Sequence, residues 1–240
     1  MASFLRFRSW LSSTGSGRGS GSPLPAVRQA SYFDSRFRPH PERDRVWRHI
    51  ARYLSRWWDP AEAAILDVGT GYCSFINAAP ARRRVAVDIH DRLPDYAAPN
   101  VECVQASATD LREIDSATFD VLFASNLLEH LTREEIPLAL AEFLRVLRPG
   151  GRLILVQPNF RLCASEYFDD YTHLTPLSDR SLRDLLLVAG FRPLLVRPRF
   201  LPLTLRSRRS RLSFLVPLYL RSPWRPLAQQ MLIVAESPPA

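Results

Sequence analysis

The stretch Ala64-Ile-Leu-Asp-Val-Gly69-Thr-Gly71-Tyr-Cys73-Ser-Phe75 decides the fold that we expect for this chain. Its apolar run ends in a glycine-rich turn, and a short apolar-periodic segment follows. This is the pattern of a buried strand, a tight loop and the start of a helix. Glycine has no Cβ and tolerates a positive φ, so such a loop lets backbone N–H groups approach a ligand closely.

A second apolar run, Val85-Ala-Val87, ends in Asp88, nineteen residues after Gly69. An acidic residue at about this spacing, at the tip of the next strand, can accept hydrogen bonds from ribose hydroxyls. The glycine loop and Asp88 together therefore predict a site for a nucleoside-containing cofactor. A dinucleotide site would favour a third glycine at position 74, where this chain has Ser74.

Strand patterns and helical patterns alternate along the middle of the chain. We expect strands at residues 64–69, 84–89, 101–106, 119–125 and 153–156, a sixth strand reached through 191–200, and a last strand at 231–236. Helices are expected at residues 42–58, 74–80, 133–147 and 178–189. In the third helix, Thr132 and Glu135 have capping-box spacing, and Gly150 and Gly151 are expected to end it. The alternation predicts an α/β fold with a Rossmann-like doubly wound sheet, mostly parallel, that binds ligands at the carboxyl ends of its strands.

The glycine loop resembles motif I of the class I methyltransferases that depend on S-adenosylmethionine (SAM). Asp67, Gly69 and Gly71 match the acidic residue and the first two glycines of that motif. Cys73 stands where the third glycine usually falls, which is a departure from the family pattern by one small residue.

Two later segments are similar to the same family. Residues 119–131, with Phe-Asp-Val at the start and Asn-Leu-Leu-Glu-His-Leu at the end, look like the fourth-strand signature. Residues 142–151, Glu-Phe-Leu-Arg-Val-Leu-Arg-Pro-Gly-Gly, look like the E-x-x-R-V-L-x-P-G-G helix end. The resemblance spans residues 42–200 and 229–236, and it implies a last strand that lies antiparallel beside strand six.

This resemblance implies SAM as the cofactor. The cofactor-binding residues that it implies are Asp67, Gly69, Gly71, Asp88, Ile89, Ser107, Ala108 and Asn126. In this assignment Asp67 orders the loop, Asp88 holds the ribose hydroxyls and Ile89 flanks the adenine. Ser107 occupies the position where many relatives carry an acidic residue that contacts the adenine amino group. Asn126 faces the methionine part of SAM.

Methyl transfer from SAM depends mainly on positioning, because a sulfonium methyl group is already electrophilic. A hydroxyl acceptor also benefits from a general base, and histidine suits this role near neutral pH. His130, after strand four, and His173, among polar and aromatic residues, are the candidate catalytic residues. The alternative for both is structural, as a turn cap that includes Glu129 or as a local hydrogen bond. The acidic and histidine residues show no recognisable metal-ligand spacing, so no metal site is predicted.

Composition bounds the class of protein. The chain has 240 residues, a net charge of +8, and 32 basic residues that are all arginine. An anionic partner or an arginine-biased genome would explain this charge, and we favour the genome for most of the chain. The three cysteines form no C-x-x-C pair, which fits a reducing cytosol without a disulfide framework or zinc site. No apolar run is long enough to span a membrane.

The expected organisation has four parts. Residues 1–40 read as a flexible N-terminal tail, 41–200 as the SAM-binding core, 201–229 as an apolar and basic insertion, and 230–240 as the last strand with a C-terminal tail. The arginines and serines of the tail resemble a mitochondrial transit peptide in composition, but we favour a disordered bacterial tail. A cytoplasmic location with membrane association is expected, and a mitochondrial one is the alternative.

The insertion is longer than the usual hairpin between the last two strands. Within residues 203–226, an apolar stretch is flanked by arginine and tryptophan, which suits a segment in a membrane interface. A lid over a lipid-like or glycan substrate, a dimer contact, and extra core along the sheet edge are the alternatives.

The expected function is methyl transfer from SAM to a small-molecule, glycan or lipid-linked acceptor, at oxygen. Residues 72–77 and 169–173 look like segments of bacterial methyltransferases linked to polysaccharide or lipid-linked glycan synthesis. A nicotinamide-dependent oxidoreductase and a non-catalytic binding protein of the same fold are the alternatives. Nucleic acid is not an expected partner, because no Asn/Asp-Pro-Pro-Tyr/Phe motif follows strand four. The acceptor and the oligomeric state stay open, since the fold does not fix them.

Overall fold

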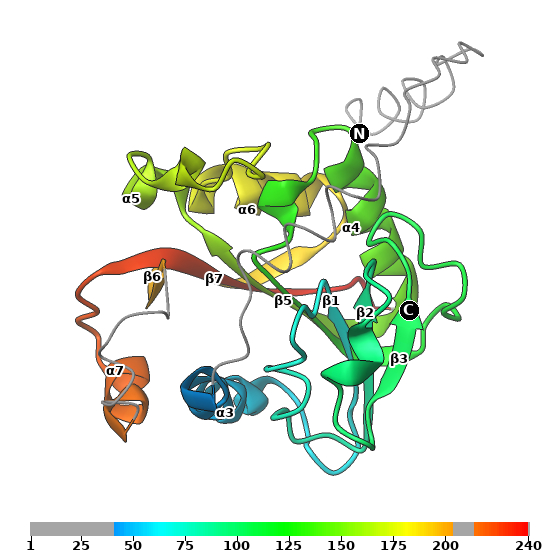
Figure 1. Ribbon diagram of the computed structural model, residues 1–240. Coiled ribbons are helices and arrows are strands. Elements are labelled where there is room, and N and C mark those ends of the chain that lie inside the picture. Colours follow the sequence, from blue (N-terminus) through cyan, green and yellow to red (C-terminus); the bar gives the residue numbers. More distant parts are fainter. Residues whose placement is uncertain (1–40, 204–213, 240) are drawn as a thin grey trace, which may run out of the picture. The chain divides into compact units, whose positions relative to one another are not determined.

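The computed structural model describes residues 41–203 and 214–239 (Figure 1). The tail expected at residues 1–40 and the segment 204–213 of the insertion lie outside these described residues. The strands are β1 (Ala64–Val68), β2 (Arg83–Asp88), β3 (Glu102–Gln105), β4 (Phe119–Ser125), β5 (Leu147–Pro158), β6 (Arg192–Pro202) and β7 (Ala228–Glu236). The α-helices are α3 (Pro41–Leu54), α4 (Glu135–Val146), α5 (Phe160–Cys163), α6 (Asp179–Val188) and α7 (Val216–Arg221). Short 3-10 helices are η1 (Ser55–Trp57), η2 (Leu93–Asp95), η3 (Leu128–His130) and η4 (Tyr167–Asp169).

The strands of the described residues form one sheet in the order β3-β2-β1-β4-β5-β7-β6. The first five strands in this order pair in parallel, whereas β7 is antiparallel to both β5 and β6. The predicted α/β doubly wound sheet with an antiparallel last strand is therefore confirmed. The chain leaves β1 toward β2 and later returns to β4 on its other side. This reversal creates a crevice at the carboxyl ends of β1 and β4, where such folds bind ligands.

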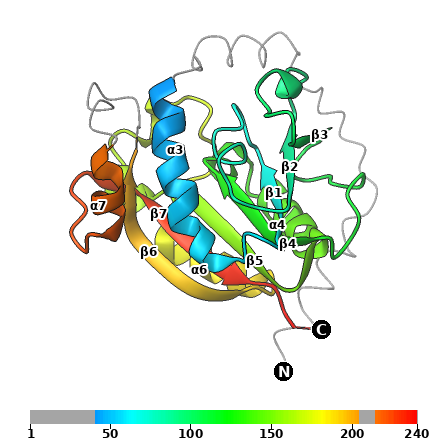
Figure 2. The ribbon, with the colours of Figure 1, turned by 90° about the horizontal axis from the view of Figure 1, so that it is seen from below.

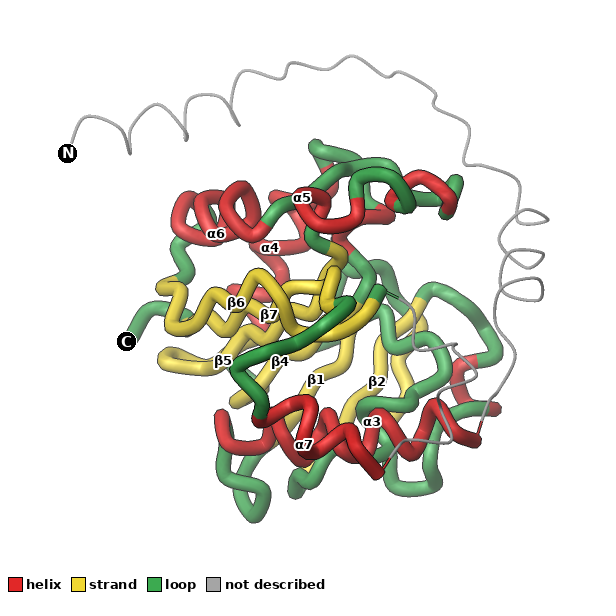
Figure 3. Tube along the Cα trace, turned by 90° about the vertical axis from the view of Figure 1, so that its left-hand side faces the viewer, coloured by secondary structure: helices red, strands yellow, loops and turns green. Residues whose placement is uncertain are grey.

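Helices cover both faces of the sheet. Helices α4, α5 and α6 lie on one face, and α3 and α7 lie side by side on the other (Figures 1, 2 and 3). Two buried clusters fill these layers, and neighbouring residues of one strand point to opposite clusters. Leu153 and Leu155 of β5 pack on the α4–α6 side, while Ile154 and Val156 pack on the α3–α7 side. This two-sided burial explains why the strand is continuously apolar.

Residues 74–80, which were expected to form a helix, form turns instead. Cys73 adopts φ +54, and Pro80 has no N–H, so only a short stretch remains between two helix-incompatible positions. The side chain of Asn77 fastens these turns, because it donates to the Tyr96 carbonyl at 2.8 Å and accepts from the Ala98 N–H at 2.8 Å. The helix prediction is therefore wrong here, and the segment reaches β2 as an ordered loop.

Helix α4 also ends earlier than expected, at Val146 instead of residue 147 with a stop at the glycines. Leu147 already pairs with Phe119 of β4, so β5 begins there rather than at residue 153. Gly150 has φ +74, and a Cβ on Gly151 would lie 2.9 Å from the Arg148 carbonyl oxygen. The two glycines thus allow the strand to bend. At its other end the helix begins at Glu135 instead of residue 133. The predicted capping box is present, because Thr132 and Glu135 exchange backbone-to-side-chain hydrogen bonds.

The ion pair between Glu142 and Arg145 explains the E-x-x-R part of the helix-end motif. Arg145 donates to both carboxylate oxygens of Glu142, at 2.9 and 2.8 Å. The same guanidinium donates to the carbonyls of Leu111 and Ile114, at 2.8 Å each, and Glu142 accepts from the Leu111 N–H at 2.7 Å. The pair therefore fastens the β3–β4 connection to α4.

We expect the substitution Arg145→Ala to lower the free energy of unfolding by roughly 2 kcal/mol, because buried carbonyls would lose their donors. Arg112→Ala is the matched control, because Arg112 pairs with Asp110 but its side chain is 82% exposed. Its expected cost is about 0.5 kcal/mol or less. Urea titrations of the two variants measure both values, and equal costs would contradict the structural role of Arg145.

Candidate cofactor and acceptor site

The loop after β1 has an unusual backbone. Gly69, Gly71 and Cys73 all have positive φ values, of 69°, 55° and 54°. A Cβ on Gly69 would lie 2.8 Å from Cδ1 of Leu127, which follows β4. A Cβ on Gly71 would meet no atom within 4 Å. The first glycine is therefore required by close packing against the β4 end, and the second lies next to open space.

Asp88, at the carboxyl end of β2, joins the loop after β1 to the loop after β2. Its Oδ2 accepts a hydrogen bond from the Gly71 N–H at 2.8 Å, and its Oδ1 accepts one from the Ile89 N–H at 2.8 Å. Oδ1 also accepts a longer hydrogen bond from the His90 N–H at 3.4 Å. Oδ2 can accept a second hydrogen bond, so the side chain keeps capacity for a ligand hydroxyl. Ile89 is 47% exposed beside it, as an apolar surface next to a polar group.

Asp67 lies beneath the loop and is buried. Its carboxylate accepts a hydrogen bond from the Thr70 hydroxyl at 2.7 Å. Burial raises the pKa of Asp67 to about 7, and the nearby Asp88 charge acts in the same direction. A cation placed above the loop would reverse part of this shift, because an opposite charge favours the ionised form. The residue therefore suits a ligand that carries positive charge.

Cys73 takes the place of the third glycine without lining an open pocket. Its side chain is fully buried, and burial raises the pKa of the thiol to about 12. The thiol therefore stays protonated and unreactive near neutral pH. The next residue, Ser74, donates from its hydroxyl to the Asp44 carboxylate at 2.9 Å, which joins the loop to α3.

The other residues of the expected cofactor site follow β3 and β4. The Ser107 hydroxyl is 2.8 Å from the Thr109 hydroxyl and accepts from the Thr109 N–H at 3.2 Å. Ala108 is buried among core residues, so only its backbone is available to a ligand. Asn126 is exposed at the end of β4, with φ +50, and its amide oxygen accepts from Gln230 of β7 at 2.9 Å. Ser107 thus makes a local turn, whereas Asn126 lies at the crevice.

The two candidate catalytic histidines lie together, although 42 residues separate them in the chain. The ring centroids of His130 and His173 are 4.9 Å apart. Glu129 joins them, and one ligand atom from each of the three side chains lies within 4.8 Å of the others. Sequence spacing does not indicate this cluster, because a separate segment must fold back over η3 to form it.

Backbone hydrogen bonds hold that segment in place. The Glu129 carbonyl accepts from the N–H groups of Leu174 and Thr175, at 2.7 and 3.1 Å. The Tyr167 hydroxyl donates to the Thr175 carbonyl at 2.7 Å, and its ring is fully buried. The backbone of Glu129 therefore anchors this segment, which is the structural role expected as the alternative to catalysis. Its side chain takes part in none of these hydrogen bonds.

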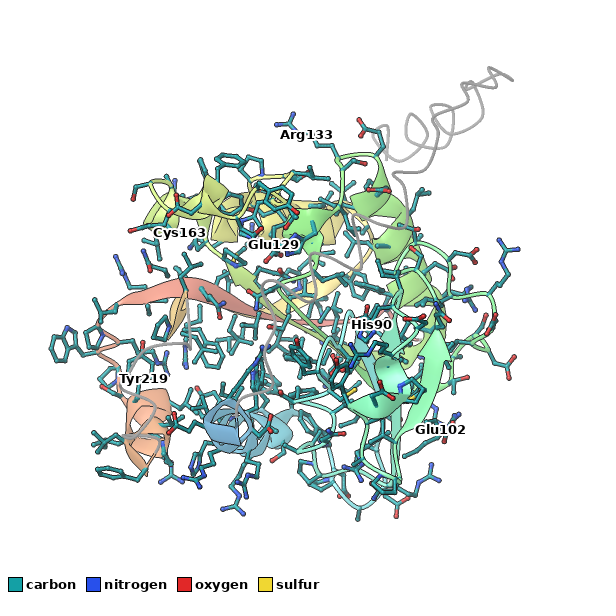
Figure 4. The ribbon with its side chains drawn as sticks, in the orientation of Figure 1. His90, Glu102, Glu129, Arg133, Cys163 and Tyr219 are labelled. Carbon is teal, nitrogen blue, oxygen red and sulfur yellow. The ribbon has the colours of Figure 1, made fainter. Side chains whose placement is uncertain are left out.

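The Glu129 carboxylate is the unusual group of the cluster. The residue is 1% exposed, and neither carboxylate oxygen has a hydrogen-bond partner among the described residues. Burial raises the pKa of Glu129 to about 8. The pKa of His130 is lowered, first by burial and then by the neighbouring His173. Figure 4 shows Glu129 on the side of the sheet that faces α5 and α6, away from Tyr219 of α7.

The sheet order, the glycine loop and Asp88 define a class I methyltransferase fold with its ligand-binding edge. Residues 66–155 match the model of a methyltransferase-domain family. This range runs from β1 into β5 and includes the glycine loop, Asp88 and His130. No curated protein matches the sequence.

Solved structures of the same fold are distant in sequence. A SAM-dependent methyltransferase from Archaeoglobus fulgidus is 19% identical, with a TM-score of 0.62, over 87% of this chain and 99% of its own. A chain of the Haloferax volcanii complex between the Trm112 methyltransferase activator and a methyltransferase is 16% identical, with a TM-score of 0.63, over 82% and 91%. The [4+2]-cyclase SpnF is 19% identical, with a TM-score of 0.58, over 80% and 81%. Such identities establish the fold, and the family match adds the methyltransferase domain. The chain therefore has the class I methyltransferase fold and contains a methyltransferase domain.

The titration of Asp67 gives a test of the loop. An unfolded Asp has a pKa of about 3.9, and Asp67 in the folded chain has one of about 7. The folded state holds the proton more tightly, so this residue's contribution to stability is lost as the pH rises from the lower value through the higher one. We expect Asp67→Asn to gain stability relative to wild type across this window, by at most about 1.4 kcal/mol per pH unit, and to level off above it.

Denaturant titrations of both proteins at several pH values between about 5 and 8 measure this difference. Glu129 also titrates within this range, but it is common to both proteins and cancels. A difference that does not depend on pH would contradict the raised pKa of Asp67.

Proposed function

We propose that this methyltransferase transfers the methyl group of SAM to a hydroxyl of a small-molecule, glycan or lipid-linked acceptor. One observation carries the proposal of the cofactor site. The Gly71 N–H and the Asp88 carboxylate join the loops at the carboxyl ends of β1 and β2, beside the open space above Gly71. An acidic strand end next to a close backbone turn suits a nucleoside with a charged tail.

In this proposal, the remaining hydrogen-bond capacity of Asp88 binds the ribose hydroxyls, and exposed Ile89 packs on the adenine. Asp67 orders the loop through Thr70 and favours the positive charge of the cofactor above it. Asn126 contacts the methionine part from the other side of the crevice. Ser107 and Ala108 contribute through the turn after β3, Ala108 by its backbone alone.

When bound, SAM supplies an electrophilic methyl group. An acceptor oxygen must then be positioned for in-line attack, and its proton must leave. His130 and His173 are the candidates to receive that proton, because His130 follows the β4 end and His173 lies beside it. The lowered pKa of His130 keeps its imidazole neutral, which a proton acceptor requires.

The two alternatives are weaker on structural grounds. A nicotinamide dinucleotide site would favour a glycine at position 74 for close packing of a helix on the strand, whereas the Ser74 side chain is buried there and bonded to Asp44. The [4+2]-cyclase SpnF has a similar fold, so this fold also hosts other reactions. A binding protein without catalysis would still use the loop at Gly71 and Asp88, so cofactor binding must be tested separately from turnover.

Calorimetric titration with SAM tests the cofactor site. We expect saturable binding by the wild-type protein, and a loss of at least about tenfold in affinity for Asp88→Ala, since two ribose hydrogen bonds would be lost. Asp184→Ala, which removes an exposed carboxylate from α6, is the matched control and should bind as wild type. Circular dichroism confirms that each variant is folded.

NAD is titrated in parallel. NAD binding in place of SAM would overturn the cofactor assignment. If a folded Asp88→Ala variant bound SAM with wild-type affinity, the ribose would have to be bound by another residue.

The surface around α7 supports an acceptor that is linked to a lipid. Large apolar side chains there are exposed, with Trp224 77%, Phe214 and Leu218 68% each, and Leu227 65% exposed. A patch of this kind on a soluble domain is typical of a membrane or partner contact. No helix of the described residues is long and apolar enough to cross a bilayer. We propose a cytoplasmic enzyme that contacts the membrane peripherally through residues 203–226.

A groove of about 670 Å³ beside this patch carries positive charge, which would match an anionic membrane surface. Arg56, Arg197, Arg199, Arg221 and Arg225 line it together with Tyr53, and no acidic side chain is among its described lining residues. Arg225 is held by backbone carbonyls of α7, whereas Arg221 is exposed. Guanidinium groups bind phosphate oxygens well, so anionic headgroups or a lipid phosphate suit this groove.

Vesicle co-sedimentation tests the contact. We expect the full chain to bind vesicles that contain anionic lipid, and to bind at least about tenfold more weakly when Leu218→Ser and Trp224→Ser are combined, because each loses apolar burial. Leu187→Ser, at an exposed apolar position of α6, is the matched control. Equal binding by all three proteins, or no binding by wild type, would rule out the proposed contact.

A further inference from the structure

The cluster of Glu129, His130 and His173 contains more than a proton acceptor requires. A single neutral imidazole is sufficient to accept a proton from a hydroxyl. Here two imidazoles and a carboxylate converge, with one ligand atom of each within 4.8 Å of the others. Two elements that are distant in the chain, η3 and the segment after η4, supply them.

The carboxylate of Glu129 is suited to bind a cation. It is 1% exposed, and both of its oxygens lack a hydrogen-bond partner among the described residues. An unpaired buried carboxylate costs several kcal/mol, so buried carboxylates are normally paired, hydrogen-bonded or bound to a metal. The backbone of Glu129 is anchored by Leu174 and Thr175, which keeps the side chain in this position.

Both histidines are oriented as metal ligands usually are. The Nδ1 atom of His173 lies 2.6 Å from the Tyr167 carbonyl oxygen, and that of His130 lies 3.2 Å from the Thr172 carbonyl oxygen. A carbonyl oxygen can only accept, so each Nδ1 carries the proton. In the neutral form of each ring, Nε2 then keeps the lone pair. Metal-bound histidines show the same arrangement, in which a carbonyl or carboxylate fixes the tautomer.

A side-chain relay supports His130 further. The Thr172 hydroxyl donates to the Asp170 carboxylate at 2.7 Å. Its oxygen lies 3.0 Å from Nδ1 of His130 and can accept a hydrogen bond from that nitrogen. Asp170, Thr172 and His130 thus form the chain of outer partners that raises the basicity of a ligating imidazole.

We propose that Glu129, His130 and His173 bind a divalent transition-metal ion. Two imidazoles with one carboxylate favour borderline ions such as Zn²⁺, Fe²⁺ or Co²⁺ over Mg²⁺, which prefers oxygen ligands. Ligand atoms at about 2.0–2.2 Å from one ion are about 3–4 Å apart, so the cluster has to close by only about 1–2 Å. The two histidines are partly exposed, which gives the ion a path from solvent.

Three protein ligands leave at least one coordination position for another group. This part of the inference rests on the proposed function: the open position would take the acceptor hydroxyl, which a bound cation makes more acidic. The histidines then hold the ion, and the proton of the acceptor hydroxyl would pass to solvent water instead of to an imidazole. Metal binding by the three side chains does not depend on that role and can be measured without an acceptor.

Titration of the tag-free full chain with Zn²⁺ and with Co²⁺, after treatment with a chelator, tests the site. We expect one ion to bind per chain, with visible Co²⁺ absorption bands that report imidazole coordination. Glu129→Gln, His130→Ala and His173→Ala should each weaken binding by about tenfold or more, since loss of an outer partner alone typically costs that much. His49→Ala removes an imidazole from α3 outside the cluster and should bind the ion as wild type does.

Titration of every variant with SAM separates the two proposals. Retained SAM affinity shows that a variant is folded and that a failure of metal binding concerns the cluster alone. Loss of SAM binding with retained metal binding would count against the proposed function and not against the metal site. The metal site is overturned if no stoichiometric ion binds, if the three cluster variants bind as wild type, or if Glu129→Gln alone keeps full affinity.

Discussion

The sharp turn after β1 is the constraint on which the site depends. Gly69 lies so close to Leu127 that a Cβ would clash, and the Gly71 N–H is held by the Asp88 carboxylate. These two contacts join the ends of β1, β2 and β4. The turn therefore does more than pass the chain from a strand to the next element. It places three strand ends so close together that one ligand can contact all of them.

The sheet order explains why a ligand can bind between these strand ends. Because β4 returns to the other side of β1, the segments after β1 and β4 form opposite walls of one crevice. Asp67, Asp88 and the glycines lie on one wall. Asn126 and the cluster of Glu129, His130 and His173 follow on the other. A donor and an acceptor of a methyl group would thus meet between the two walls, with the ribose and adenine contacts after β2 and the acceptor chemistry after β4.

The antiparallel part of the sheet has a different role. Gln230 of β7 donates to Asn126, so the last strand supports the crevice from its far side. The connection between β6 and β7 carries α7, whose apolar side chains are exposed next to an arginine-lined groove. If lipid-linked acceptors are used, this arrangement would place the membrane contact on the sheet face opposite α5 and α6. The cofactor crevice would then be reached along the strand ends.

The sequence alone determined the fold class, the strand positions and the glycine loop, because these depend on local patterns of apolar residues and glycine. It did not determine that residues 74–80 form turns, since cysteine as a residue type does not indicate the positive φ that Cys73 adopts. Nor did it show that Leu147 joins β5, because pairing with Phe119 overrides a helical pattern that continues through it. The cluster of Glu129, His130 and His173 was decided by tertiary structure alone. Long-range backbone contacts, such as those between Glu129 and the residues after His173, brought together side chains that no spacing in the chain relates.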